Sequence, residues 1–209
     1  MTTSAGAAQF TEPATEERLE RVAAALTANN FAVEILDGVT AARERVKDLI
    51  PEGASVFTGA SETLQVSGID SDINTSGRYD AVKSHTLTMD RERERRTLWQ
   101  LISTPDFIVG SAQAVTETGS LVIASASGAQ LPGYAGAAAH AIWIVGAQKV
   151  VPDLDAALRR VESHCLPLEN DRAMEVYGQP SALNRLLILH AEPHFGRGTV
   201  LLLREAIGF

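Results

Sequence analysis

Apolar residues follow two different spacings along this chain, and the two spacings alternate from one end to the other. Leu19, Val22 and Leu26 recur at about 3.6 residues, the helical period, after Thr15, a residue type that caps helices. The run FAVEIL at 31–36 instead has the composition of a strand. We expect further helices at 40–50, from Ser61 onward, at 91–103 and at 151–163, and strands ending at Gly59 and covering 106–110, both sides of 118–119, 139–146, 185–190 and 199–203.

This interleaving of helices and strands predicts the fold class. It indicates an α/β protein with a Rossmann-like, mostly parallel sheet that carries helices on both faces. A chain of 209 residues is within the usual range of one domain. Residues 1–14 are rich in Ala, Ser and Thr and contain Pro13, which is typical of a flexible tail. We therefore expect a single α/β domain over 15–209.

Composition and charge narrow the classes of function. Hydrophobic residues make up 45% and charged residues 21%, as in folded soluble proteins. The formal net charge is −8, and the basic run at 91–96 is interrupted by glutamates, so we expect no nucleic-acid partner. No apolar run approaches the roughly 20 residues that span a bilayer, and the first residues lack the pattern of a signal peptide. These features predict a cytoplasmic protein with no membrane partner.

The chain contains one cysteine, Cys165. One cysteine can neither form an internal disulfide nor ligate an iron–sulfur cluster by itself. We therefore expect no cofactor in this chain, and any cluster must lie on a partner. Cys165 itself is more typical of a buried small hydrophobic residue than of a nucleophile.

Two stretches follow predicted strands, where ligands bind in parallel sheets. In FTGASETLQ at 57–65, Gly59 permits close backbone approach and Ser61 opens a helix, an arrangement that suits a phosphate or carboxylate but also an ordinary strand-to-helix turn. In AVTETGSLVIASASG at 114–128, Glu117 lies beside a Thr118-Gly119 turn. Glu117 is either a solvated turn residue or a nucleophile or base, with the N–H groups of Gly119 and Ser120 available to an oxyanion.

The C-terminal region offers other candidate groups. His190, Glu192 and His194 would project to one side of an extended strand, a set that suits zinc or non-haem iron, although a polar loop is the simpler interpretation. Arg197 is either a clamp for an anionic substrate or a solvated arginine. The small-residue loop GAQLPGYAGAAAH at 128–140 leaves room for a ligand or for a second copy of the chain, so a homo-oligomer is among the expected states.

Three stretches resemble the lactate-utilization (LUD) domain family. They are TGASETLQVSGI at 58–69, FIVGSAQAVTETGSLVIASASG at 107–128, which contains a motif like A-E-T-G-T-L, and LPGYAGAAAHAIWIVGAQKVV at 131–151. In the first stretch Ser61, Thr63, Leu64, Gly68 and Ile69 match the family's S-x-T-L-x-x-x-G-I segment. The C-terminal region departs from the family, because LILHAEPHFGRG lacks the usual Gly-Pro-Ser anion loop.

The resemblance implies a fold akin to sugar-phosphate isomerases and CoA transferases. It also implies a place beside two iron–sulfur partner proteins that oxidise L-lactate to pyruvate. The turn at Glu117, Thr118 and Gly119 is similar to the Glu-Asn-Gly turn of CoA transferases, with threonine in place of asparagine.

Three hypotheses about function follow from these patterns. The first is a cytoplasmic component of lactate oxidation that binds a small carboxylate, or organises iron–sulfur partners. Its site contains Glu117, with Gly59, Ser61, Thr118, Gly119, Ser120 and Arg197 as binding residues and no metal ligand. The second is a stand-alone isomerase or acyl-transferase for a phosphorylated or acyl small molecule, which uses Glu117 as base or nucleophile. The third is an interaction subunit with a vestigial pocket.

Overall fold

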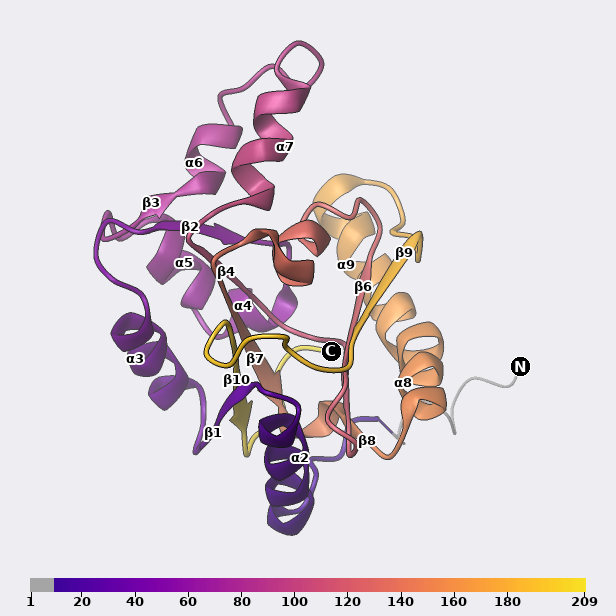
Figure 1. Ribbon diagram of the computed structural model, residues 1–209. Coiled ribbons are helices and arrows are strands. Elements are labelled where there is room, and N and C mark those ends of the chain that lie inside the picture. The colour runs from indigo at the N-terminus through magenta and orange to yellow at the C-terminus, as the bar shows by residue number, and fades with distance from the viewer. Residues whose placement is uncertain (1–9) are drawn as a thin grey trace.

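Two β-sheets form the centre of the protein in the computed structural model, which describes residues 10–209 (Figure 1). The larger sheet has six strands in the order β1-β10-β7-β4-β2-β3, and every pair in it is parallel. These strands are β1 (Ala32–Leu36), β2 (Ser55–Thr58), β3 (Asp80–Ala81), β4 (Phe107–Gly110), β7 (His140–Gly146) and β10 (Gly198–Leu203). The prediction of a mostly parallel sheet is therefore confirmed for this part of the fold.

The smaller sheet has four strands in the order β8-β5-β6-β9. They are β5 (Ala114–Thr116), β6 (Leu121–Ser125), β8 (Val150–Val151) and β9 (Arg185–Leu189). Strand β6 is antiparallel to both of its neighbours, whereas β5 and β8 are parallel. The predicted strand pair around 118–119 is thus the β5–β6 hairpin of this second, mixed sheet.

The buried strand β7 shows why the two sheets stack. Ala141, Trp143 and Val145 point to the face that packs against the small sheet, and Ile142 and Ile144 point to the other face. Successive side chains of a strand alternate between faces, so a run that is apolar throughout must be covered on both sides.

Helices cover one face of the large sheet, and the small sheet covers much of the other. The first face carries α3 (Val39–Leu49), α4 (Glu62–Val66) and α5 (Ile69–Asn74). The second face packs against α2 (Glu16–Ala28) and the small sheet, whose outer side carries α8 (Leu154–Arg160), the π-helical turn Val161–Cys165 and α9 (Leu166–Tyr177) (Figure 1). Helices on both faces of a single sheet were predicted, and the second sheet is the correction to that prediction.

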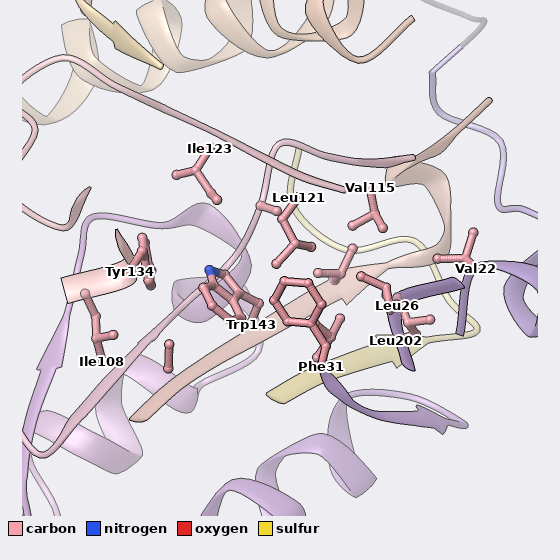
Figure 2. Packing of buried hydrophobic residues seen from close by; sticks show 14 of the residues in the cluster. Val22, Leu26, Phe31, Ile108, Val115, Leu121, Ile123, Tyr134, Trp143 and Leu202 are labelled. Atoms are coloured by element: carbon pink, nitrogen blue, oxygen red, sulfur yellow. The ribbon is translucent and has the colours of Figure 1, made fainter. Parts of the chain in front are cut away.

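The core between the sheets is organised around Trp143 (Figure 2). The indole meets Phe31 edge-on, with ring centroids 6.0 Å apart, and Tyr134 at 5.3 Å. Gly110 of β4 makes room for Tyr134, because a Cβ at Gly110 would overlap the phenol oxygen. Leu121 and Ile123 of the small sheet complete the cluster from the opposite side (Figure 2).

Some predicted boundaries need correction. Helix α7 (Arg95–Ser103) begins four residues later than expected, after a turn, and with α6 (Val82–Thr86) it projects from the body as an arm (Figure 1). Helix α9 was not predicted. Of the expected tail 1–14, residues 1–9 lie outside the described residues, whereas Phe10 and Ala14 are buried. None of the helices within residues 10–209 combines the length and apolar character needed to cross a membrane.

The chain connections create a crevice at one edge of the large sheet. Neighbouring strands β2 and β4 continue in opposite directions, because β2 leads to β3 at the sheet edge and β4 leads to β7 further inside. The first connection passes over the face of α4 and α5, and the second passes through the small sheet on the other face. In parallel sheets, ligands bind outside the carboxyl ends of two such strands.

Candidate functional site

A cavity of about 570 Å³ lies at this crevice. Residues that follow β2 and β4 line it, and so do the end of β6, the start of α9 and the segment after α9. A volume of this size matches ordinary small-molecule sites, which run from about 300 to 1,000 Å³. Its lining includes the polar residues Thr63, Ser111, Gln113, Ser125, Gln130 and Lys149.

Lys149 is the unusual residue of this cavity. It ends the short 3₁₀-helix Ala147–Lys149 between β7 and β8, and its relative exposure is only 1%. The ammonium group donates to Thr63 Oγ1 at 2.8 Å and to Ser111 Oγ at 3.1 Å, and both of these residues also line the cavity. Among residues 10–209, no carboxylate forms an ion pair with it. A buried lysine held by two hydroxyls alone is rare in a protein core.

The surroundings of Lys149 oppose its positive charge. Burial lowers the pKa of Lys149 to about 7, and the charge of nearby Arg160 adds to this effect. Loss of hydration disfavours the charged form of an amine, and a neighbouring cation does the same. Lys149 is therefore poised between ammonium and free amine near neutral pH.

The other cations that line the cavity differ from Lys149. Lys83 pairs with Asp70 at 2.6 Å, and Arg172 forms a two-point ion pair with Glu169 at 2.7 and 2.8 Å. Arg91 is exposed to solvent. An anion that enters the cavity would meet in Lys149 a cation without a carboxylate partner.

Gly59 and Ser61, two of the expected binding residues, do line the cavity. Ser61 caps α4, because its hydroxyl accepts from the Leu64 N–H at 3.4 Å. A Cβ at Gly59 would approach the Gln130 Cβ to 3.3 Å, so glycine here brings the strand end close to the opposite wall. These two residues lie in the segment between β2 and α4, and Thr63 of α4 accepts a hydrogen bond from Lys149.

Cys165 also lines the cavity but is buried beside Arg160. Arg160 Nη1 donates to the Cys165 sulfur and to the Gln113 carbonyl. Burial raises the pKa of the Cys165 thiol. A thiol held in its neutral form behaves as a small apolar residue rather than as a nucleophile.

Glu117 lies outside the cavity lining, on the β5–β6 turn against α2. Arg18 Nε donates to Glu117 Oε1 at 2.7 Å, and Arg21 Nε lies 3.5 Å from Glu117 Oε2. Both arginines belong to α2. In this geometry the Glu117 carboxylate attaches the small sheet to α2, and the structure does not bring it together with Gly59 and Ser61.

The Thr118-Gly119 turn serves the same packing. Gly119 has a φ of +81°, and a Cβ there would lie 2.7 Å from the backbone carbon of Ala25. Asn29 at the end of α2 donates to the carbonyls of Thr118 and Gly119. The N–H groups expected to bind an oxyanion are already used, since Gly119 N–H donates to the Thr116 carbonyl and Ser120 N–H donates to Thr116 Oγ1.

Arg197 and the three residues considered as an alternative metal site, His190, Glu192 and His194, are also separate from the cavity. Arg197 Nη1 donates to Glu192 Oε1 at 2.6 Å, and both side chains are largely buried. His190 Nδ1 lies 2.9 Å from Ser120 Oγ, so the imidazole of His190 is the hydrogen-bond partner of this hydroxyl. No group of three His, Cys, Asp or Glu side chains among residues 10–209 is arranged to hold a metal ion. The metal hypothesis for His190, Glu192 and His194 is therefore wrong for this geometry.

The sequence contains a signal for Lys149 that inspection of strand ends does not detect. Lys149 is the one charged residue in AIWIVGAQKVV at 141–151, a run that is otherwise apolar or small apart from Gln148. Charged residues are rarely buried without a partner, so a lysine inside such a run indicates a special environment.

Comparison with known proteins agrees with this architecture. A family model, the LUD domain, matches residues 19–180. A crystal structure of a DUF162 family protein from Deinococcus radiodurans is similar over 91% of this chain and 99% of that chain, with 12% sequence identity and a TM-score of 0.53. At this identity the likeness shows the fold alone. No curated protein matches the sequence.

Proposed function

This chain belongs to the LUD domain family, which is associated with lactate utilization, and from this membership we propose its role. It is a cytoplasmic component of the oxidation of L-lactate to pyruvate, and it binds a small carboxylate in the cavity at Lys149. Within this proposal the fold is of the sugar-phosphate isomerase and CoA-transferase type, whose ligands bind at strand ends.

One observation carries the proposal, the buried Lys149 at the carboxyl edge of the large sheet. Its hydrogen-bond partners are hydroxyls, which do not neutralise an ammonium charge. A ligand carboxylate would supply the missing negative charge inside a region of low dielectric constant, where an ion pair is stronger than in water. Binding of an anion therefore also favours the protonated form of Lys149.

The electrons of lactate oxidation must leave through other groups. The conversion of lactate to pyruvate releases two electrons, and the single Cys165 cannot ligate an iron–sulfur cluster by itself. In this proposal the clusters lie on partner proteins, and this chain supplies a binding site for substrate or product. The role of Glu117 as base or nucleophile of a stand-alone isomerase or acyl-transferase gains no support from its ion pairs with arginines of α2.

A thermal-shift screen tests the proposal. The full chain would be heated with lactate, pyruvate, acetyl-CoA or a sugar phosphate, beside its Lys149→Met variant and the control Lys47→Met. Lys47 is an exposed residue of α3, so its loss removes the same charge without touching the cavity. A ligand that binds only the folded state adds about 2.7 kcal/mol of stability at a concentration of 100 Kd.

We expect lactate or pyruvate to raise the melting temperature of the wild type and of Lys47→Met but not of Lys149→Met. A melting-temperature shift of equal size in Lys149→Met would show that Lys149 does not bind the ligand. The absence of any shift in the wild type would instead favour a vestigial cavity and a role confined to partner binding.

A further inference from the structure

We propose that Lys149 is also an amine nucleophile, which forms an imine with the carbonyl carbon of a 2-oxo acid. The acid that reacts in this cavity is then the oxo form of the metabolite, pyruvate or a longer homologue, whereas the hydroxy form can only bind. The inference rests on the proposed function, because the acid must first bind at Lys149.

The position of Lys149 meets the geometric needs of such a nucleophile. Its amine lies at a cavity wall, and two hydroxyls fix it, Thr63 Oγ1 at 2.8 Å and Ser111 Oγ at 3.1 Å. Thr63 is itself held in place, because Gly208 approaches so closely that a Cβ there would overlap Thr63 Oγ1. The amine is thus positioned before any ligand arrives, which lowers the entropic cost of reaction.

The charges around Lys149 make the free amine accessible. Burial and the nearby Arg160 lower its pKa to about 7, and no carboxylate in the described part of the chain pairs with it. A lysine becomes a nucleophile when it is desolvated or lies next to another cation, and both conditions hold here. By contrast, Lys83 is paired with Asp70 and Lys47 is exposed to solvent.

The reaction needs no oxidant or further reagent. The ammonium group that binds the carboxylate first loses a proton to water. The amine lone pair then attacks the ketone carbon and forms a carbinolamine, while a proton moves from nitrogen to the former carbonyl oxygen. Loss of that oxygen as water then gives the imine, and protonation makes it an iminium cation. The Thr63 and Ser111 hydroxyls lie within hydrogen-bond distance of the nitrogen and are suited to pass these protons.

Imine formation distinguishes pyruvate from lactate, the two acids of the proposed reaction. Lactate has no carbonyl carbon apart from its carboxylate, so it can bind at the ammonium group but cannot form the imine. The cavity, at about 570 Å³, is large for a three-carbon acid and leaves space for a longer side chain on the ketone.

Reductive trapping tests this inference directly. The full chain would be incubated with pyruvate and sodium cyanoborohydride, which reduces an imine to a stable secondary amine, and then mapped by peptide mass spectrometry. The chain has only three lysines, Lys47, Lys83 and Lys149, so the modified amine can be assigned without ambiguity. Lactate in place of pyruvate is the negative control, and Lys47→Met is the matched variant.

We expect a pyruvate adduct on Lys149 in the wild type and in Lys47→Met, and none with lactate. Modification of Lys47 or Lys83 to the same extent as Lys149 would overturn the inference, because it would show only general amine reactivity. No adduct on Lys149, together with a retained melting-temperature shift by pyruvate, would also overturn it while the proposed carboxylate site stands. Loss of both signals would reject both proposals.

Discussion

Lys149 is destabilising for the folded state at neutral pH. Its pKa falls from 10.5 to about 7 on folding. The penalty for burying the ammonium is therefore fully present below pH 7, shrinks between pH 7 and pH 10.5, and is absent above. At about 1.4 kcal/mol per pKa unit it reaches roughly 5 kcal/mol at most.

The first prediction follows from this penalty. Lys149→Met should raise the free energy of unfolding at pH 6, and the gain should shrink as the pH rises towards 10, because methionine carries no buried charge. Urea denaturation at several pH values measures it, with Lys47→Met as the control. A variant that is less stable than the wild type at pH 6 would show that the protein tolerates the charge of Lys149.

Glu117 gives the second prediction at this scale. Glu117→Gln removes the charge that pairs with Arg18, and the two side chains remain 25% and 33% exposed. A partly exposed pair of this kind contributes about 1 kcal/mol or less, so we expect a small loss of stability in urea denaturation. The variant should bind pyruvate as tightly as the wild type. A Glu117→Gln variant that keeps its fold but no longer binds pyruvate would show that Glu117 takes part in ligand binding.

The sequence predicted some of these residues and missed others for physical reasons. Gly59 and Ser61 follow a recognisable strand and line the cavity. Glu117 is a candidate because its stretch resembles the family motif and the Glu-Asn-Gly turn of CoA transferases. Its partner Arg18 lies 99 residues away in the chain, a pairing that local patterns do not reveal. Lys149 was missed because its environment depends on Thr63, Ser111 and the burial of the whole segment.

At the scale of elements, the contact of the β5–β6 turn with α2 depends on Gly119. We predict that Gly119→Ala costs about 3 kcal/mol, because the left-handed backbone and the overlap with Ala25 add together. Gly53→Ala is the matched control, since Gly53 has a φ of +77° but no atom lies within 4 Å of the position that a Cβ would take there. In chemical denaturation, the free energy of unfolding should fall further for Gly119→Ala than for Gly53→Ala, by the cost of the steric overlap with Ala25. Equal losses would mean that α2 shifts without cost.

A second element contact depends on the Arg197–Glu192 pair, which joins the segment after β9 to the carbonyls of Gly133 and Tyr134. Burial raises the pKa of Glu192, and Arg197 opposes that shift. Arg197→Met leaves Glu192 unpaired and should cost about 3 kcal/mol, whereas the double variant Arg197→Met with Glu192→Leu should recover much of the loss. Equal unfolding free energies for the two variants would contradict this assignment.

Most elements were predictable, because their apolar periods are clear. The strands of the large sheet other than β3, and helices α2, α3 and α8, follow from the spacing of apolar residues. Helix α8 also follows from its cap, Asp153, which accepts from the Ala156 N–H at 2.8 Å. Helix α9 was missed because its apolar residues are not gathered on one face, and Ala173 is its one buried residue. The assignment of β9 to a second sheet was not predictable, since strand partners depend on contacts between distant segments.

At the scale of the whole molecule, the cavity follows from topology. The connections that follow β2 and β4 leave on opposite faces of the large sheet, and the crevice lies between them. The small sheet lines one side of the cavity, and Lys149, at the end of the short 3₁₀-helix after β7, lines its wall. The family was predictable from three sequence stretches, but one of them, around Glu117, serves packing against α2 in this structure. Motif and site are therefore distinct parts of the molecule.

The sharpest test of the Lys149 site is a calorimetric titration of pyruvate into the wild type and into Lys149→Met at pH 7. We predict measurable binding to the wild type and an affinity roughly 10- to 100-fold lower for the variant, because one charge-assisted hydrogen bond is lost. Equal dissociation constants for the two proteins would show that Lys149 does not bind the ligand.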